Sequence, residues 1–491
     1  MIAAGGLAGA AHAAQSSPAE PSTPVPIVAE DGQVMSYILN ARNANPGQTR
    51  LVEKAIAAAG GVVVQSWPQI GVVVAHSDRA SFRADVARSG GNALQSVGPT
   101  RTVPVLEGTP AEAQAPWGPG ASDENKGKNK KANGDIESVT TPFTGDPDAR
   151  EIDQWDLRLI KADQAHAITD GSRNVLVGVL DSGISPEHPD LKPNIDVASS
   201  VNCTEAGRPD TSADGWYPTT SDHGTHVAGT IAAARNGVGV VGVAPGVRLA
   251  SVKVVSDEGY IYPEYAVCGF MWAGEHKMDV TNNSYYVDPF EFWCGDQPEQ
   301  AAALEAVSRA VAWSTGRGVV NVAALGNSAV DLRTNTTDNG SPNDAATPTP
   351  RTINDTCKDM PAQLPGVVGV SSITSTGQLS YFSNRGLGET DVAAPGSSIL
   401  STVVNTRTGI NGYGTKSGTS MASPHVAGVL ALMKSAHPSF TPAQLTAKLR
   451  ADATDTACSA PQLNRGPACE GTLEYNSYYG DGIVDALKAV Q

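Results

Sequence analysis

The feature that most constrains the fold is a regular alternation, from Asp153 to Gln491, of short apolar runs with stretches of helical spacing. The run Asn174–Leu180 (NVLVGVL) is apolar at positions that face both ways, as in a parallel strand buried between two layers of helices. Three later runs have the same character: Ala250–Val255, Val319–Leu325 and Val367–Ile373. Helical spacing is found at His226–Ala234, Glu264–His276, Gln300–Thr315, Met421–Ser435 and Pro442–Leu449. The pattern predicts an α/β domain with a mostly parallel central sheet over residues 150–491.

A smaller unit precedes this domain at residues 36–106. Its strand and helix patterns follow one another at Ser36–Leu39, Gln48–Ala59, Val62–Gln65, Gly71–Ala75, Ser77–Ser89 and near Val103–Leu106. The order β-α-β-β-α-β is that of a ferredoxin-like α+β domain.

Residues 107–149 between the two units are rich in Pro, Gly, Ala, Asn and Lys, and predict a flexible linker. The lysines of this segment could also form a patch for nucleic acid. However, 34 Lys and Arg stand against 50 Asp and Glu, a net charge of -16, which disfavours nucleic acid and anionic membranes as partners. The sequence has no run of 18 apolar residues, so we expect no membrane anchor.

The first residues indicate export. Met1–Ala14 is rich in Ala and Gly and contains Ala11-His12-Ala13 before a polar stretch, a pattern typical of the end of a secretory signal peptide. A basic n-region is missing, because the first Lys or Arg is Arg42, and a disordered Ala-rich terminus is the alternative. We therefore expect a signal-peptide remnant and disordered segment at 1–35, and an extracellular protein.

Six cysteines all follow residue 200, and none forms the C-x-x-C pairs of zinc or redox sites. An even number of cysteines in an exported protein favours disulfides. Of the 15 pairings that six cysteines allow, proximity indicates only Cys458–Cys469. For the remaining four we expect Cys203–Cys268 and Cys294–Cys357, although no spacing requires it.

Four polar residues stand where strands end and helices begin, which is where functional groups gather in an open α/β sheet. Asp181 closes its strand in Leu180-Asp181-Ser182-Gly183, and Asn327 follows the strand Val319–Leu325. His223 and Ser420 each open a helical stretch. Convergence of these residues on one edge of the sheet would provide the groups needed for acyl transfer.

Each residue has a chemical role in that reaction. The hydroxyl of Ser420 needs an adjacent base to become a nucleophile, and His223 can supply it. Asp181 would hold the other imidazole nitrogen and stabilise the imidazolium. The backbone N–H of Ser420, at the positive end of a helix, and the side-chain amide of Asn327 would form the oxyanion hole. This chemistry needs no cofactor.

The segments around these residues resemble the signature motifs of the subtilisin-like serine peptidases, the subtilases. HGTHVAGT begins at His223 and GTSMASPHVAG at Gly418, and together with Asp181 they follow the family order Asp, His, Ser. The resemblance implies a subtilisin-like three-layer fold for 150–491 and a secreted endopeptidase made as a zymogen. Residues 36–106 would be its inhibitory propeptide, with Val103–Leu106 in the cleft until cleavage within 107–150. The substrates would be proteins or peptides, and we expect a monomer.

The resemblance also implies a structural calcium site. The segment from Ala234 to Val240 (ARNGVGV) is similar to the family's calcium loop. The ligands would be the carbonyls of Ala234, Val238 and Val240 and the side chains of Asn236 and Asp190. Oxygen ligands with few carboxylates suit Ca²⁺. A Gly/Val turn without an ion is the alternative, because related enzymes lose this site.

For the substrate cleft, the resemblance implies that Ser284, Tyr285 and Tyr286 add a strand to an extended peptide and that Gly326 lines the cleft. The family usually has Ser-x-Gly here, so Tyr286 replaces a glycine. It would either crowd the pocket or turn outward and pack on Tyr285 or Phe290. Insertions after Tyr286 and Asn327, which contain Cys294 and Cys357, are expected to border the cleft.

Two other functions remain open from the sequence. One is an inactive subtilase fold used for binding, and the other is an esterase or acyltransferase that forms the same acyl-enzyme. The motif around Ser420 differs from the G-x-S-x-G of α/β-hydrolases, which argues against an esterase. His226 and His425 lie within the motifs but further into their helices, so we expect them to pack.

Overall fold

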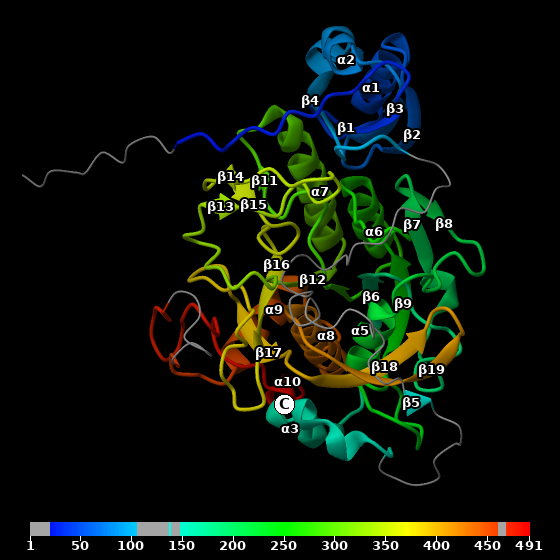
Figure 1. Ribbon diagram of the computed structural model, residues 1–491. Coiled ribbons are helices and arrows are strands. Elements are labelled where there is room, and N and C mark those ends of the chain that lie inside the picture. Colours follow the sequence, from blue (N-terminus) through cyan, green and yellow to red (C-terminus); the bar gives the residue numbers. More distant parts are fainter. Residues whose placement is uncertain (1–19, 106–136, 139–147, 460–467) are drawn as a thin grey trace, which may run out of the picture.

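The computed structural model describes residues 20–105, 137–138, 148–459 and 468–491, which form a large α/β domain with a small α+β unit on one side (Figure 1). The expected signal peptide and most of the expected linker, including most of the region of the predicted cleavage, lie outside the described residues. No described helix is both long and apolar enough to cross a lipid bilayer.

An eight-stranded sheet forms the centre of the large domain, in the order β17-β16-β12-β10-β6-β9-β7-β8. Its strands are β6 Leu176–Asp181, β7 Val201–Glu205, β8 Arg208–Asp210, β9 Arg248–Lys253, β10 Val280–Asn283, β12 Val320–Ala324, β16 Val367–Ile373 and β17 Val392–Pro395. Neighbouring strands pair in parallel except at the edge, where β7 and β8 are antiparallel. Every residue of β6 is buried, so the prediction of an α/β domain with a mostly parallel sheet is confirmed.

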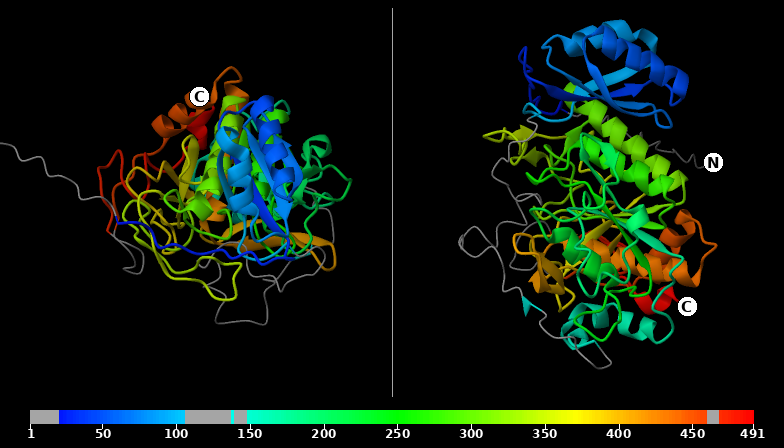
Figure 2. Two further views of the ribbon diagram at one scale, coloured as in Figure 1. Left: turned by 90° about the horizontal axis from the view of Figure 1, so that it is seen from above. Right: turned by 90° about the vertical axis from the view of Figure 1, so that its right-hand side faces the viewer.

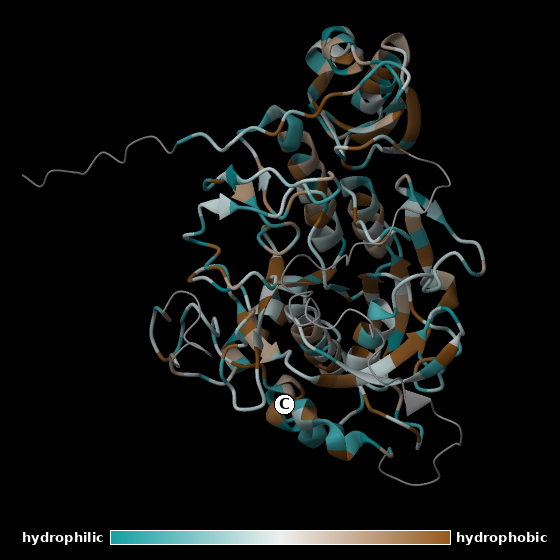
Figure 3. Cartoon of the chain, in the orientation of Figure 1, coloured by the Kyte–Doolittle hydropathy of each residue, from teal (hydrophilic) through white to brown (hydrophobic). Residues whose placement is uncertain are grey.

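Helices cover both faces of this sheet. One apolar core lies under α6 Pro263–Glu275 and α7 Pro298–Gly316. The other lies under α5 His223–Ala232, α8 Thr419–Ala436, α9 Pro442–Asp452 and α10 Ala486–Ala489, together with the short helices α3 Trp155–Leu159 and α4 Ala162–His166. The right-hand view of Figure 2 shows the layers in turn, with the α7 helix on one side of the sheet and the orange α8 helix on the other. In Figure 3 the inner strands are largely brown and the outer loops largely teal or white, as burial of apolar strands requires.

The large domain also contains smaller sheets outside the central one. The hairpin of β18 Ile399–Asn405 and β19 Ile410–Lys416 pairs with β5 Glu137–Ser138. One short ladder joins the insertion after Tyr286 to the insertion after Asn327, by pairing β11 Trp293–Cys294 with β15 Cys357–Lys358. A second ladder lies within the insertion after Asn327 and pairs β13 Thr337–Asp338 with β14 Arg351–Thr352.

The small unit has the predicted ferredoxin-like order. It consists of β1 Met35–Ala41, α1 Pro46–Ala58, β2 Val62–Trp67, β3 Val72–Ser77, α2 Phe82–Gly90 and β4 Leu94–Pro99, in an antiparallel sheet β2-β3-β1-β4. The predicted position of its last strand is wrong, because β4 and not Val103–Leu106 pairs with β1. Pro104 has no N–H to donate to a ladder, and the edge of β1 is already taken by β4.

The sheet of the small unit lies on helices α6 and α7 (Figure 1). At Gly98 of β4 the backbones come close: a Cβ there would lie 2.8 Å from the carbonyl oxygen of Glu299, so only glycine fits without a shift. The amide of Asn40 donates to the carbonyl of Ala302 at 2.8 Å, and Arg309 of α7 donates to the carbonyl of Ala41 at 2.9 Å. The contact between the two units is therefore close and hydrogen-bonded.

Disorder over the whole of 1–35 is also a wrong prediction, because residues 20–34 are placed and part of them pack on the large domain. Ser22 is 2% exposed and donates from its N–H (2.9 Å) and its hydroxyl (2.6 Å) to the carboxylate of Asp296. The N–H of Thr23 donates to the carbonyl of Thr352 at 2.9 Å. These partners come from insertions far along the chain, which a local pattern of residues does not reveal.

Three disulfides join the expected pairs, Cys203–Cys268, Cys294–Cys357 and Cys458–Cys469. The first connects β7 to α6 and the second connects β11 to β15. A disulfide that closes a loop of this kind typically stabilises a fold by about 2–4 kcal/mol.

Candidate active site

Asp181 and His223 face one another at the edge of the central sheet. Asp181 is the last residue of β6 and His223 the first of α5, and Nδ1 of the imidazole lies 2.9 and 3.0 Å from the two carboxylate oxygens. Because the carboxylate only accepts, Nδ1 carries the proton and Nε2 is left as the basic nitrogen. A side chain at Gly224 would meet the carbonyl oxygen of Gly183 at 2.5 Å, so the glycine of the motif lets α5 approach the strand.

Ser420 is anchored to the end of the neighbouring strand. Its hydroxyl donates to the carbonyl of Ser284 at 3.2 Å, while the Ser284 hydroxyl donates to the carbonyl of Ser420 at 2.8 Å. Ser284 follows β10, in which Asn283 pairs with Leu180 of β6. Ser284 and Asp181 are therefore equivalent positions at the carboxyl ends of adjacent strands, and Ser420 is held at the same edge as the Asp181–His223 pair.

Asn327 lies beside the start of α8 with its amide in a defined orientation. One side-chain atom accepts from the N–H of Thr419 at 2.8 Å and from its hydroxyl at 2.9 Å. A backbone N–H needs an acceptor, so that atom is Oδ1 and Nδ2 points the other way. Nδ2 has no acceptor among the described residues, and it lies 3.6 Å from where a side chain of Gly418 would begin. It is therefore available to donate to an incoming oxygen.

A second donor lies on the same helix. Ser420 is the second residue of α8, so its N–H is one of the first four that lack an acceptor within the helix. The positive end of the helix dipole favours negative charge at this point. The two donors and the hydroxyl of Ser420 thus occur together, as acyl transfer requires.

Gly326 supports this arrangement through its backbone. Its φ of +97° is in the region that favours glycine, and a Cβ would lie 2.5 Å from Nδ2 of Asn384. Its N–H donates to the Thr419 hydroxyl at 3.1 Å, which ties the turn after β12 to the start of α8.

Tyr286 points into the insertion that follows Asn327. It is 8% exposed, and its hydroxyl accepts from the side-chain amide of Asn343 at 3.1 Å. The ring is thus buried against the insertion that follows Asn327, and Phe290 packs edge-on against Trp293 at 5.0 Å. Tyr285 is also buried, and its hydroxyl donates to Oδ1 of Asn283 at 3.0 Å.

The two other histidines of the motifs make structural contacts. Nε2 of His226 lies 3.0 Å from the carbonyl of Ile399, and burial lowers its pKa well below the usual value. His425 contacts the carbonyl of Met421 and the carboxylate of Asp156, at 2.8 and 3.0 Å. Both are packed within the domain as expected.

The expected calcium loop holds one carboxylate that the sequence indicated and one that it did not. Asp190 accepts from the N–H of Val240 at 3.0 Å and from the hydroxyl of Tyr413 at 2.9 Å, and burial raises its pKa to about 7. Asp148, 2% exposed, accepts from the N–H of Gly237, and its Oδ2 has no partner among the described residues. Burial raises the pKa of Asp148 as well. Nothing in the local pattern singles out Asp148, which falls at the end of the predicted linker.

The donor set is that of a hard cation, but one of the expected ligand atoms, Oδ1 of Asn236, already accepts a hydrogen bond. Two buried carboxylates that face the same loop favour a divalent ion, which would offset their charge. Asn236 donates to the carbonyl of Pro189 at 3.1 Å, but its Oδ1 accepts from the N–H of Val238 at 3.0 Å. As a ligand, Oδ1 of Asn236 would have to give up that bond, whereas Oδ2 of Asp148 would not.

A central parallel sheet with a serine, a histidine–carboxylate pair and an amide at its carboxyl edge defines a serine hydrolase of the subtilisin type. Residues 172–470 match the model of the Subtilase family. Subtilisin E of Bacillus subtilis (strain 168) is 34% identical over 337 residues, which cover 69% of this chain and 71% of that protein. Subtilisin of Bacillus pumilus is also 34% identical, over 69% of this chain and 98% of its own length. The chain belongs to the subtilase family, with the activity of a serine endopeptidase that needs no cofactor for catalysis.

Solved structures share the fold. The epidermin leader peptide processing serine protease (EpiP) of Staphylococcus aureus aligns with a TM-score of 0.66 and 20% identity, over 94% of this chain and 98% of that one. Fervidolysin of Fervidobacterium pennivorans, a keratinolytic enzyme related to subtilisin, aligns with a TM-score of 0.62 and 22% identity over 94% of this chain. The match spans 62% of fervidolysin.

Proposed function

We propose that this subtilase hydrolyses peptide bonds through an acyl-enzyme on Ser420, with His223 as the base and Asp181 as the residue that orients it. The main support is the placement of Nδ1 of His223 within 3.0 Å of both oxygens of Asp181, which puts the proton on Nδ1 and makes Nε2 the basic nitrogen of the ring. The availability of Nδ2 of Asn327 supports the oxyanion hole.

In the first step, the Ser420 hydroxyl turns from the carbonyl of Ser284 toward Nε2 of His223 and gives up its proton there. Its oxygen bonds to the substrate carbonyl carbon, and the resulting oxyanion accepts from Nδ2 of Asn327 and the N–H of Ser420. Collapse breaks the C–N bond, and the proton on Nε2 passes to the leaving amine. Water then attacks the ester in the same way, its proton passing through Nε2 back to Ser420.

The substrate would bind as an extended strand along Ser284, Tyr285 and Tyr286, with Gly326 opposite. The side chains of both tyrosines are buried, so the backbone of this segment and not the rings would contact the peptide. This mode of binding suits protein and peptide substrates.

A labelling experiment and a kinetic comparison test this function. A fluorophosphonate probe should label the wild-type protein at Ser420 and fail to label S420A. Absence of labelling in the wild type would favour an inactive fold used for binding. Efficient cleavage of a peptide ester with no cleavage of the matched anilide would instead favour an esterase or acyltransferase.

We also propose that the enzyme is a secreted zymogen and that residues 36–106 are its inhibitory propeptide. The hydrogen-bonded contact of this unit with α6 and α7 supports the inhibitory role, and three disulfides support an oxidising compartment. Cleavage within 107–150 would release a mature monomer. N-terminal sequencing of the active form would test the removal of the propeptide, and size-exclusion chromatography would test the monomeric state. An active form that still begins before residue 36 would contradict the proposed propeptide.

A structural calcium site is a further part of the proposal. Asp148 and Asp190 would hold the ion with the loop carbonyls of Ala234, Val238 and Val240, and Asn236 would join after releasing Val238. The unpartnered buried Oδ2 of Asp148 supports it. The ion would hold the loop and take no part in the reaction.

A further inference from the structure

A pocket of about 380 Å³ opens beside Asn327. Its lining includes Glu291 and Phe292 from the insertion after Tyr286, Ser328 and Asp338 from the segment after β12, and Phe382. The volume falls in the range of about 300–1,000 Å³ that is common for ligand pockets. Because Asn327 would hold the oxygen of the scissile carbonyl, a pocket in contact with it is within reach of a side chain next to the scissile bond.

Glu291 is the acidic group of this pocket that has no ion pair among the described residues. It is 7% exposed, its carboxylate accepts from the Ser328 hydroxyl at 2.8 Å, and its N–H donates to the Ser341 hydroxyl at 2.8 Å. Those bonds fix its position in the wall. Burial, followed by the nearby charge of Asp338, raises the pKa of Glu291 to about 7. Among the described residues, no Lys, Arg or His forms an ion pair with it.

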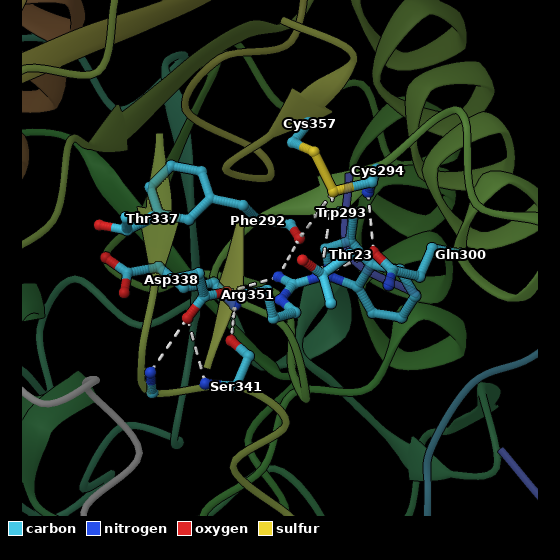
Figure 4. A network of polar contacts seen from close by, with 12 residues as sticks. Thr23, Phe292, Trp293, Cys294, Gln300, Thr337, Asp338, Ser341, Arg351 and Cys357 are labelled. Carbon is cyan, nitrogen blue, oxygen red and sulfur yellow. Dashed lines mark hydrogen bonds and ion pairs between the residues drawn. A yellow bond between two sulfur atoms is a disulfide. The ribbon is translucent and has the colours of Figure 1, made fainter. Parts of the chain in front are cut away.

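The second carboxylate of the pocket differs in this respect. Asp338 pairs with Arg351, both fully buried, and also accepts from the N–H groups of Gly340 and Ser341 at 3.0 and 3.1 Å (Figure 4). Arg351 in turn donates to the carbonyl of Phe292 at 2.6 Å. Its guanidinium is thus committed to Asp338 and to the backbone of the wall. Its charge also acts on Glu291 and lowers the pKa of that carboxyl, but burial outweighs this effect, and Arg351 makes its ion pair with Asp338 and not with Glu291.

A third carboxyl, that of Asp359, is close enough to Glu291 for the two charges to interact. Asp359 is 1% exposed, and a Cβ at Gly326 would lie 3.6 Å from its Oδ2. Its Oδ1 has no partner among the described residues, and burial, with Glu291 as the next cause, raises its pKa well above the usual value. The surroundings of Glu291 therefore favour an added positive charge over an added neutral or negative one.

We propose that this pocket receives a Lys or Arg side chain of the substrate at one of the two positions that flank the scissile bond, and that Glu291 determines this specificity. The substrate cation would form the ion pair that the protein itself does not provide. The statement rests on the function proposed for Ser420 and adds the class of substrate. Glu291 touches the side chain of the substrate and takes no part in bond breaking.

The test uses the processed wild-type enzyme and a diverse peptide pool, with cleavage sites identified by mass spectrometry. Lys and Arg should be enriched at one flanking position. Cleavage without such enrichment would overturn the specificity while leaving the peptidase function intact. Absence of any cleavage would remove the peptidase function together with this inference.

A charge-neutral variant of nearly the same shape tests the residue itself. Glu291→Gln should lower kcat/KM for a peptide anilide with a basic flanking residue by about 30-fold or more, because a buried charge pair is lost. For a matched peptide with Gln in place of the basic residue, kcat/KM should change less than about 3-fold. Glu305→Gln on α7, where Glu305 pairs with Arg309 outside the pocket, is the matched control and should leave both values unchanged. Equal losses on both peptides in Glu291→Gln would overturn the assignment, and if that variant does not fold, the wild-type cleavage profile decides.

Discussion

Arg101 of the small N-terminal unit forms a buried ion pair with Glu264 of α6, with Nη2 2.5 Å from Oε1. The two side chains are 8% and 0% exposed. Glu264 also accepts from the hydroxyls of Ser36 and Thr100, at 3.0 and 3.1 Å. Three residues of the small unit thus converge on one carboxylate of the large domain, which makes Glu264 the main polar anchor between them.

We expect Arg101→Met to weaken the hold of the small unit on the large domain. Removal of one partner of a buried ion pair costs about 3–5 kcal/mol, because the other charge is left unpaired. Full-length Arg101→Met should therefore become accessible to a fluorophosphonate probe earlier than the wild type during a time course of activation. Arg88→Met removes an exposed pair with Asp85 and is the control. An unchanged time course in Arg101→Met would show that the pair does not control release.

The segment from residue 20 to residue 25 should depend on Asp296. Burial would raise the pKa of Asp296, but hydrogen bonds from Ser22, Asn354 and Thr356 outweigh it and lower the pKa to about 2. Asp296→Asn should loosen this segment, and hydrogen exchange at the amides of Ser22 and Thr23 should accelerate about 10-fold or more.

The same contact should weaken in acid. A depressed folded-state pKa gives a contribution that is fully present above about 4 and is lost as the pH falls toward 2. The exchange rate of the Thr23 amide, corrected for the intrinsic effect of pH, should therefore rise in the wild type below about pH 4 and not in Asp296→Asn. Equal pH dependence in both proteins would contradict this role of Asp296.

Asn327→Ala should lower kcat by about 10²–10³-fold, the loss that removal of one oxyanion donor causes in subtilisin, with a smaller effect on KM. The reason is that Nδ2 would donate to charge that develops only in the transition state. Steady-state kinetics on a peptide anilide measure both constants. Asn405→Ala, in the β18–β19 hairpin, is the matched control and should keep the wild-type kcat. A purely higher KM in Asn327→Ala would place the residue in substrate binding instead.

Calcium should raise the melting temperature more at pH 8 than at pH 5. The pKa of Asp190 is raised to about 7, so at pH 5 its carboxyl is protonated and a cation must displace the proton, whereas at pH 8 it is ionised. Ion present at about 100 times its Kd would stabilise the fold by about 2.7 kcal/mol. Scanning calorimetry with and without EDTA would measure the shift.

Asp148→Asn should reduce this shift, since the calcium site would lose one of its two charged ligands. Glu187→Gln is a control on an exposed carboxylate near the loop, which pairs with Lys192. No shift with calcium in the wild type at either pH would dismiss the site.

Much of the fold and of the candidate site is determined by neighbours in the sequence. The run NVLVGVL predicts β6 because a strand buried on both faces must be apolar at every position, and Asp181 follows as the residue at its end. His223 and Ser420 begin helices that the motifs predict, and parallel strands bring such ends to one edge. The patterns were sufficient there because the forces that set them act within a few residues.

The tertiary structure alone decided what depends on long-range contact. Ser22 and Asp296 are separated by 274 positions, and Arg101 and Glu264 by 163, so neither partner changes the pattern around the other. The last strand of the small unit is Leu94–Pro99 and not Val103–Leu106, because Leu94–Pro99 pairs with the edge of β1. Glu291 lines a pocket because its insertion folds next to the segment that contains Asn327. Burial and ion pairing depend on which surfaces meet in space, and that is settled only when the whole chain has folded.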